Sequence, residues 1–440
     1  MPLVAFVPFS GLRVRERELL ELGMTLPSLR ERGEAIAGLP PLGLLTLAGM
    51  TPEPWTKSWH DLSSPAPEAR AALVEELVRQ APDLVAISAL TASIQEAYAF
   101  ADALRGRGLT VVMGGLHVSM CPEEAAAHAD IIAIGDGEPV WPAILRDVEA
   151  GRTKPRYQAG VFDLSEAPLP DFDLPGPRTS RYAIQTERGC PLACEFCGAS
   201  RLLGPFREKP LDRIAAELAA ITARTPRPLI ELADDNTFAG NRDPAPLLAL
   251  FREAEARWFT EVDWRVGEDP ELVDLLVESG CVQALVGIES LVFRHSGMGA
   301  KDRELGRITA ACEAMQARGL PVNACLIVGA DGEDHDSLNR LEEFLLQSPF
   351  AEIQLTLQTP FPGTALRRRL EAEGRLLADR DWSHCTLFDG TFQPDRLSVS
   401  ELEQGFRGLL SRVFAAGPSR RRRALRREIW SRRRGRGATT

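Results

Sequence analysis

Short apolar runs alternate with amphipathic stretches along most of the chain, and this alternation predicts parallel sheets. In the first 150 residues the apolar runs are 3–9, 84–88, 110–114 and 131–135, and helical periods cover 94–105, 123–128 and 140–149. Strands and helices in alternation predict a doubly wound, flavodoxin-like α/β domain over residues 1–150. The stretch 151–180 is rich in Pro, Gly and Asp and lacks a helical period, so we expect a linker there.

The alternation resumes at Tyr182 and continues through six strand–helix units. Strands are expected at 182–185, 229–232, 262–266, 284–288, 323–328 and 352–357, and helices at 211–224, 246–258, 271–279, 304–318 and 337–347. Six consecutive units predict a partial (β/α)6 barrel over residues 181–365, with its working face at the carboxyl ends of the strands. A small, mostly helical region, 366–416, and an Arg-rich tail, 417–440, are expected to follow.

Three cysteines stand directly after the first of these six strands. Cys190, Cys194 and Cys197 form a C-x-x-x-C-x-x-C pattern, and so short a loop can turn three thiolates toward one point, as an iron–sulfur cluster requires. Three ligands for four irons leave one iron open, and an open position is typical of a catalytic metal centre. The alternative is three thiols that are close in sequence without a cofactor.

Composition narrows the class of protein. The chain has 440 residues, of which 44% are hydrophobic, and its eight cysteines are scattered apart from the three in the loop. That scatter does not form a disulfide framework, and a cluster needs a reducing compartment. The apolar start lacks the flanking features of a signal peptide, and no stretch approaches the length of a transmembrane helix. We therefore expect a cytoplasmic protein.

The remaining cysteines and the tail leave open questions. Cys281, Cys312 and Cys325 fall at apolar positions and are expected in the core, whereas Cys121 and Cys385 receive no role. The net charge is -11, yet the segment 420–436 holds ten Arg and one Glu. That tail either contacts anionic lipid or nucleic acid through phosphate charge or is a solvated, disordered end.

With the cysteine loop placed after the first strand, residues 181–363 resemble the radical S-adenosylmethionine (SAM) enzymes. Phe196 fills the aromatic position usual before the third cysteine, and further matching segments are 234–238, 287–290, 326–329 and 359–363. Many members carry Gly-Gly-Glu where this chain carries Asp234 and Asp235. The resemblance implies that the three cysteines hold a [4Fe–4S] cluster, that SAM occupies the open iron, and that a flavodoxin- or ferredoxin-like protein donates the electron.

Several polar and glycine positions suit an amino-acid-like, cationic cofactor. Asp234, Asp235 and Glu289 offer acceptors to the amino group and ribose hydroxyls of SAM, and the alternative for the two aspartates is helix capping. Gly329 permits a close backbone approach to adenine or is a plain turn glycine. Arg265 either faces the cofactor carboxylate or pairs with a neighbouring acid.

The N-terminal domain resembles the cobalamin-binding domains fused to one branch of this family. The residues that carry this resemblance are Ser88 with Thr91, the run 112–118 with Gly114 and Gly115, the run 122–124, and the run 134–138 with Gly135. Glycines after strands let a flat, bulky ligand approach the sheet edge. The Asp-x-His-x-x-Gly motif is absent, so the resemblance implies cobalamin without a histidine axial ligand. The alternative is a flavodoxin-like domain that binds no ligand.

The runs 114–138, 359–366 and 381–385 are most similar to the branch that includes the hopanoid lipid methylases. The resemblance therefore implies a cobalamin-dependent radical SAM methyltransferase that uses a 5′-deoxyadenosyl radical to methylate an unactivated carbon of a lipid or secondary metabolite. One alternative is a cyclase or rearrangement enzyme without methyl transfer. A methylthiotransferase is disfavoured because only Cys121 precedes the cysteine loop, and a non-catalytic iron–sulfur or cobalamin-binding regulator is the alternative from another class.

Overall fold

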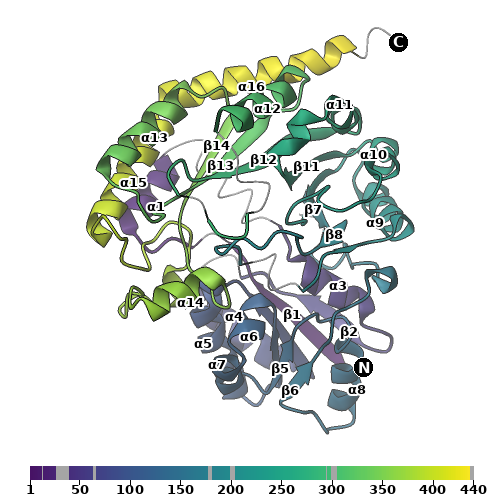
Figure 1. Cartoon of the computed structure of the whole chain (residues 1–440). Coiled ribbons are helices and arrows are strands. Elements are labelled where there is room, and N and C mark those ends of the chain that lie inside the picture. The colour runs from purple at the N-terminus through teal and green to yellow at the C-terminus, as the bar shows by residue number, and fades with distance from the viewer. Residues whose placement is uncertain are drawn as a thin grey trace.

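Two parallel sheets, each flanked by helices, follow one another along the chain (Figure 1). The computed structural model describes residues 1–11, 13–25, 39–62, 66–176, 181–198, 204–293, 295–298 and 305–436. The end of the predicted linker, the first residue of the helix predicted at 304–318 and the last four residues of the tail lie outside these ranges. The predicted fold class, a doubly wound sheet followed by a partial barrel, is confirmed.

The N-terminal sheet has the strand order β2-β1-β3-β4-β5-β6, and all neighbouring strands are parallel. Its strands are β1 Leu3–Phe9, β2 Thr56–Trp59, β3 Leu84–Ala89, β4 Val111–Gly114, β5 Ile131–Ile134 and β6 Arg156–Gln158. The chain changes direction across the sheet between β1 and β3. In open sheets of this kind a ligand binds at the carboxyl ends of the strands beside that point.

Helices cover both faces of this sheet. They are α3 Leu42–Met50, α4 Pro67–Gln80, α5 Ile94–Arg105, α6 Leu116–Met120, α7 Pro122–His128 and α8 Trp141–Glu149. Helix α1 Arg17–Thr25 packs instead with the core of the second sheet, where Leu19 is buried, and its Glu18 pairs with Arg407. Within β1, Val7 and Phe9 join the core beside α5, whereas Val4 and Phe6 join the core beside α8. Because both faces are buried, the central strands are continuously apolar, which made them recognisable in the sequence.

The two edge strands were not predicted. The sequence of β2 is Thr-Lys-Ser-Trp and that of β6 is Arg-Tyr-Gln, and the outer backbone of each lies at the sheet edge, where polar residues are tolerated. Strand β6 lies inside the stretch predicted to be a linker. The predicted linker is therefore wrong at Arg156–Gln158, which completes the N-terminal sheet by pairing with β5.

The second sheet, here called the barrel sheet, has the order β14-β13-β12-β11-β10-β7 and is also parallel throughout. Its strands are β7 Arg181–Ile184, β10 Leu229–Leu232, β11 Arg257–Val262, β12 Cys281–Glu289, β13 Val322–Val328 and β14 Glu352–Leu357. The helices between them are α9 Leu211–Arg224, α10 Pro244–Glu253, α11 Pro270–Glu278, α12 Leu305–Ala317 and α13 His335–Gln347. They lie outside the curved sheet (Figure 1).

The third barrel strand differs from its prediction. Strand β11 ends at Val262, where a strand was expected to begin, and Trp264–Glu268 forms a 3-10 helix, η3. Residues 257–262 alternate between outward-facing and buried positions, and Trp258 is fully buried. The helix predicted at 246–258 wrongly included the first two residues of this strand. An apolar residue at every second position also partly matches the spacing of a helix.

The C-terminal region contains α14 Ala365–Ala372, the 3-10 helix η5 Trp382–His384, α15 Val399–Val413 and α16 Ala416–Arg436. Of the two alternatives for the tail, the disordered end is wrong over Ala416–Arg436, because α16 lies across the end of the barrel farthest from the N-terminal sheet (Figure 1). Arg433 donates to Gly319 O at 2.7 Å and to Cys281 O, and Arg426 pairs with Glu352 at 2.5 Å. These acceptors stand at or before the starts of β12, β13 and β14, so the tail covers the amino ends of the strands.

Among the described residues, no helix is both long and apolar enough to span a membrane.

Candidate functional site

The cysteine loop leaves the first barrel strand and is held by backbone hydrogen bonds. Before it, β8 Glu187–Arg188 pairs antiparallel with β9 Arg207–Glu208. Within it, Ala193 N donates to Gly297 O and Glu195 N donates to Ser296 O, each at 3.0 Å. A Cβ atom at Gly297 would lie 1.9 Å from Ala193 O, so glycine is required for this close approach. The loop is therefore fixed from two sides before any metal binds.

The environment of Cys190 suits a metal-bound thiolate. Burial raises the pKa of this thiol, and the nearby Cys197 raises it further, whereas hydrogen bonds from the Leu192 backbone and Asn236 oppose both effects. Asn236 Nδ2 donates to Cys190 Sγ at 3.8 Å. A coordinating metal deprotonates such a thiol, and N–H donors to the sulfur stabilise the thiolate once it forms.

The two predicted cofactor-binding aspartates have different environments. Asp234 is buried and accepts hydrogen bonds from Thr186 N at 2.7 Å, Thr186 Oγ1 at 2.5 Å, Glu187 N at 3.1 Å and Thr237 Oγ1 at 3.2 Å. Through these bonds the Asp234 carboxylate holds Thr186 and Glu187, which precede the cysteine loop, in place. Asp235 is half-buried, and burial together with Asp234 raises its pKa to about 6, whereas a hydrogen bond from the Gly189 backbone opposes the shift.

The other predicted barrel residues also lie near the carboxyl ends of the strands. Glu289 ends β12 in a left-handed conformation, with φ of 68°. Gly329 follows β13 with φ of 97°, and its N–H donates to Glu333 Oε2 at 2.7 Å. Phe196 packs edge-to-face on His295, with ring centroids 4.7 Å apart. Arg265 pairs with Asp263 at 2.9 Å, which is the second of its two predicted environments.

Buried polar atoms without protein partners also occur at these strand ends. Among the described residues, both amide atoms of Gln358 and Oδ1 of Asn236 are buried and lack a hydrogen-bond partner. Gln358 directly follows β14, and its side chain is almost fully buried. Because an unpaired buried amide is unfavourable, such atoms indicate where a polar ligand binds. They fit a cofactor with amino, carboxylate and hydroxyl groups, such as SAM.

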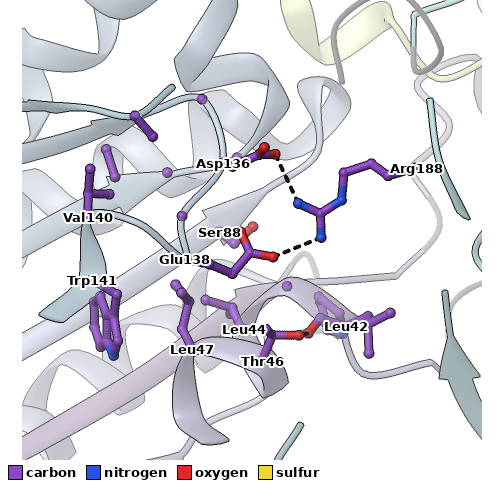
Figure 2. Close-up of a pocket in the computed structure, with 18 of the residues that line it drawn as sticks. Leu42, Leu44, Thr46, Leu47, Ser88, Asp136, Glu138, Val140, Trp141 and Arg188 are labelled. Carbon is purple, nitrogen blue, oxygen red and sulfur yellow. Dashed lines mark hydrogen bonds and ion pairs between the residues drawn. The ribbon is translucent and has the colours of Figure 1, made fainter. Parts of the chain in front are cut away.

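An open cavity of about 500 Å³ lies over the carboxyl ends of β3, β4 and β5 (Figure 2). Ser88, Gly114, Gly115 and Gly135, which were predicted to bind a cofactor, are among the residues that line it. Gly115 and Gly135 have φ of 103° and 86°, a conformation that favours glycine. Its apolar wall is formed by side chains that include Leu42, Leu47, Val140 and Trp141.

The shape and lining of this cavity fit a flat, bulky ligand such as cobalamin. Leucines of α3 face the glycine-rich loops across it, so a planar ring has an apolar floor and closely approaching backbone. Among the described residues that line the cavity there is no His, Cys or Met. Thr91 is not among them, and its Oγ1 instead lies 3.3 Å from His117 Nδ1, behind α6.

The same cavity extends to the segment that precedes the cysteine loop. Arg188 and Gln185, which precede Cys190, line its far side. Arg188 contacts Asp136 at 2.9 Å and Glu138 at 2.8 Å, and Figure 2 shows its guanidinium between the two carboxylates. The loop after β5 and the segment before the cysteines are therefore joined directly.

Several of these residues were not expected from the sequence. Gln358, Asn236, Arg188 and Glu333 were missed, and only Arg188 had a local signal, its place just before the first cysteine. Glu187 was also missed as a site residue. Burial, reinforced by Asp234, raises its pKa to about 9, and its Oε1 is buried without a hydrogen-bond partner.

Comparisons with known proteins agree with this geometry. Residues 35–145 match the B12 binding domain family and residues 184–345 match the Radical SAM superfamily. The chain is 26% identical to bacteriochlorophyllide d C-12(1)-methyltransferase of Chlorobaculum tepidum over 76% of this chain and 75% of that protein. It is 27% identical to hopanoid C-2 methylase of Rhodopseudomonas palustris over 79% of this chain and 67% of that protein.

A solved structure shares the fold of both parts. The cobalamin-dependent S-adenosylmethionine radical enzyme OxsB, solved with aqua-cobalamin bound, superposes with a TM-score of 0.69 at 12% identity. The match covers 92% of this chain and 66% of that one, so the chain spans about two thirds of its length. The chain thus belongs to the cobalamin-binding radical SAM enzymes, whose cofactors are a [4Fe–4S] cluster, SAM and cobalamin.

Proposed function

We propose that this enzyme transfers a methyl group to an unactivated carbon of an apolar lipid or secondary metabolite. The observation that carries the proposal is the position of Arg188, which lines the cavity over the N-terminal sheet and stands two residues before Cys190. The proposed cobalamin and cluster sites are therefore neighbours, and in the proposal the substrate carbon binds between them. The names of the relatives support the class, because they describe methylation of a bacteriochlorophyllide and of hopanoids.

When bound, and with an electron from an external flavodoxin- or ferredoxin-like donor, the cofactors would supply the difficult chemistry: the hydrogen-abstracting 5′-deoxyadenosyl radical and the methyl group. The residues of this chain supply positions for them. In the proposal Cys190, Cys194 and Cys197 hold the cluster, and Asn236 donates to the first thiolate. Asp235 and Gln358 bind polar groups of SAM.

The remaining predicted residues complete this arrangement. In the proposal Phe196 packs beside the cluster, and Asp234 keeps the cysteine loop in place through its four bonds to the protein. Glu289 and Gly329 line the SAM side at the ends of β12 and β13. Ser88, Gly114, Gly115 and Gly135 form the edge against which cobalamin lies, whereas the position of Thr91 removes it from that edge.

The cavity lining also has a protective role in the proposal. The wall formed by Leu42, Leu47, Val140 and Trp141 limits the access of water to the space where a radical is formed. Its apolar character also favours a substrate without charge near the reacting carbon. The charged groups at the rim, Arg188, Asp136 and Glu138, neutralise one another in part.

The test is anaerobic reconstitution of the full chain with iron, sulfide and cobalamin, followed by incubation with a one-electron reductant such as reduced flavodoxin or dithionite, SAM carrying a deuterated methyl group, and an extract of apolar metabolites. We expect 5′-deoxyadenosine and a product heavier by one labelled methyl group in place of hydrogen. An isomeric product would show a cyclase or rearrangement enzyme. The Cys194→Ala variant should make neither product, whereas the buried Cys312→Ala on α12 should retain both. 5′-Deoxyadenosine from the Cys194→Ala variant would overturn the assignment of the loop.

A further inference from the structure

A second group of metal-ligating side chains lies behind the wall of the cavity. His117, Cys121 and Glu124 follow one another at intervals of four and three residues across α6 and α7, so they lie on one side of this short helical segment. Each residue offers one ligand atom, and these three atoms all lie within 4.8 Å of one another. Leu116 and Ser119 of the same segment line the cavity instead.

The buried imidazole is aimed into this group without a hydrogen-bond partner. His117 is 1% exposed, and its Nε2 has no hydrogen-bond partner in the described structure. Glu124 Oε1, which lies 3.9 Å from this nitrogen, is also buried and unpartnered. Tyr98 contributes a third buried atom of this kind, its hydroxyl oxygen. Because an unpaired buried polar atom is unfavourable, the unpartnered Nε2 of His117 and Oε1 of Glu124 indicate a missing ligand.

The outer contacts orient these side chains. Thr91 Oγ1 lies 3.3 Å from His117 Nδ1, which leaves Nε2 to face Glu124 and Cys121. Trp382 Nε1, from η5, donates to Glu124 Oε2 at 2.9 Å. Metal-bound histidines and carboxylates are held by second hydrogen bonds of this type. The Trp382 ring also meets the His117 ring edge-on, with centroids 5.2 Å apart.

We propose that His117 Nε2, Cys121 Sγ and a Glu124 carboxylate oxygen bind a zinc ion, with the Tyr98 hydroxyl or a water in the fourth position. Ligand atoms around tetrahedral zinc are about 3.3 to 3.8 Å apart. The 3.9 Å between His117 and Glu124 is already near this range, and small side-chain rotations bring the remaining distances into it.

The charges of the group agree with zinc. A thiolate and a carboxylate balance the charge of a divalent cation, while Arg367 stands outside the group, 4.2 Å above the Trp382 ring. The metal would bind His117 as a neutral imidazole and Cys121 as a thiolate. Glu124 is partly exposed, which provides an entry path.

The site would join three parts of the molecule. It would fix α6, whose other face lines the proposed cobalamin cavity, to α5 through Tyr98 and to the C-terminal region through Trp382. This inference does not depend on methyl transfer. Its ligands are separate from Cys190, Cys194 and Cys197, so zinc and the iron–sulfur cluster can be measured independently.

The experiment loads the reconstituted full chain with zinc sulfate, removes loose metal by dialysis against a weak chelator, and measures iron and zinc by mass spectrometry. We expect about one zinc per chain in addition to the cluster iron. Zinc-edge X-ray absorption should show one sulfur at about 2.3 Å and the remaining ligands as nitrogen or oxygen. Little zinc in the wild-type protein, or a shell of three sulfurs indicating the cluster cysteines, would overturn the proposal.

Variants separate binding from folding. Cys121→Ala should lose the zinc and keep the cluster iron, and Cys312→Ala, which removes another buried thiol, should keep both. If Cys121→Ala does not fold, Trp382→Phe keeps all the ligands and removes only the bond to Glu124. Its zinc affinity should fall by about 10- to 100-fold. Unchanged zinc content and affinity in both variants would contradict the site.

Discussion

Arg188 donates to Asp136 at 2.9 Å, and this bond connects the segment before the cysteines with the loop after β5. Asp136 also accepts a hydrogen bond from Phe162 N and another from Arg207. Burial alone would raise the pKa of this carboxyl, but the bond from Phe162 N and the two guanidinium groups lower it below its usual value. The Arg188–Asp136 ion pair is therefore a mostly buried link between the two cofactor-binding domains.

Replacing Arg188 by Ala should destabilise the protein and separate the two domains. The change leaves two largely buried carboxylates, Asp136 and Glu138, without this partner, and removing one member of a buried pair costs about 3 to 5 kcal/mol. Urea unfolding at neutral pH measures the loss. In the control, Arg265→Ala, a half-exposed local pair with Asp263 is removed, and the loss should stay below about 1 kcal/mol. Equal losses in the two variants would contradict the role of Arg188.

Glu333→Gln should flatten the dependence of stability on pH between about 4.5 and 7. Burial raises the pKa of Glu333 to about 7, although the Gly329 N–H and Ser290 hydroxyl bonds oppose the shift. As pH rises above 4.5 the unfolded chain releases this proton before the folded protein does, so the free energy of unfolding falls until about pH 7. A glutamine has no proton to release. The free energy of unfolding of the variant, relative to that of wild type, should therefore increase between about pH 4.5 and 7 and then level off.

Glu401 is the control for that measurement, because its pKa is shifted in the opposite direction. Bonds within the Ser398 cap, from its N–H and hydroxyl, lower the pKa of the exposed Glu401 to about 2. Its contribution to stability is present above pH 4.5 and is lost as pH falls toward 2. Glu401→Gln should therefore differ from wild type at neutral pH and converge with it in acid. A pH-independent difference for Glu333→Gln would show that its carboxyl titrates normally.

Local patterns explain which features were predictable from the sequence. The cysteine loop was recognisable because its three candidate ligands lie within eight residues, and β1 because its two buried faces make it continuously apolar. Strand β11 was misplaced because Arg257 and Glu261 are exposed in an otherwise buried strand. The N-terminal domain has the predicted parallel order, but its polar edge strands β2 and β6 carried no apolar signal.

Contacts between distant segments were beyond the sequence. Arg188 meets Asp136 and Glu138 from about 50 positions away, and nothing near any of the three residues indicates the others. Helix α3, whose leucines line the cavity, precedes the glycine-rich loops by more than one whole strand–helix unit. Whether the Gln358 amide has a hydrogen-bond partner depends on the residues that the fold brings around it. Such features depend on tertiary packing, which single-sequence patterns do not contain.

Gly114→Leu should displace cobalamin and leave the cluster in place. Gly114 lines the cavity, and a Cβ there would make only ordinary contacts with Ala133, at 3.5 Å, so the backbone tolerates the change. The longer side chain then occupies the space over the end of β4. Absorption spectra after reconstitution should show the cluster and at most about a tenth of the wild-type cobalamin affinity, equivalent to ~1.4 kcal/mol. Gly306→Leu, on α12 where a Cβ meets no atom within 4 Å, should bind both normally.

Arg433→Ala should weaken the barrel. Its guanidinium donates to Gly319 O and Cys281 O at the amino ends of the strands, and each carbonyl would lose a charged donor. The expected loss is about 1 to 3 kcal/mol in the free energy of unfolding. Arg427→Ala on the exposed side of the same helix is the control and should change stability little. If the two variants instead have wild-type stability and lower affinity for duplex DNA, the tail is a nucleic-acid contact.

Gln358→Leu should stabilise the protein without cofactor and weaken the binding of SAM. The buried amide has no hydrogen-bond partner among the described residues, so replacing it by an apolar side chain of similar size removes an unfavourable group and should gain about 1 kcal/mol. Gln316 is a matched control, because its buried amide donates to Pro349 O at 2.7 Å and accepts from Ala351 N at 2.8 Å. Gln316→Leu should be destabilising and should leave SAM affinity unchanged. Thermal unfolding and SAM titration of both variants separate the two effects, and a Gln358→Leu protein that binds SAM as tightly as wild type would show that this amide serves another ligand.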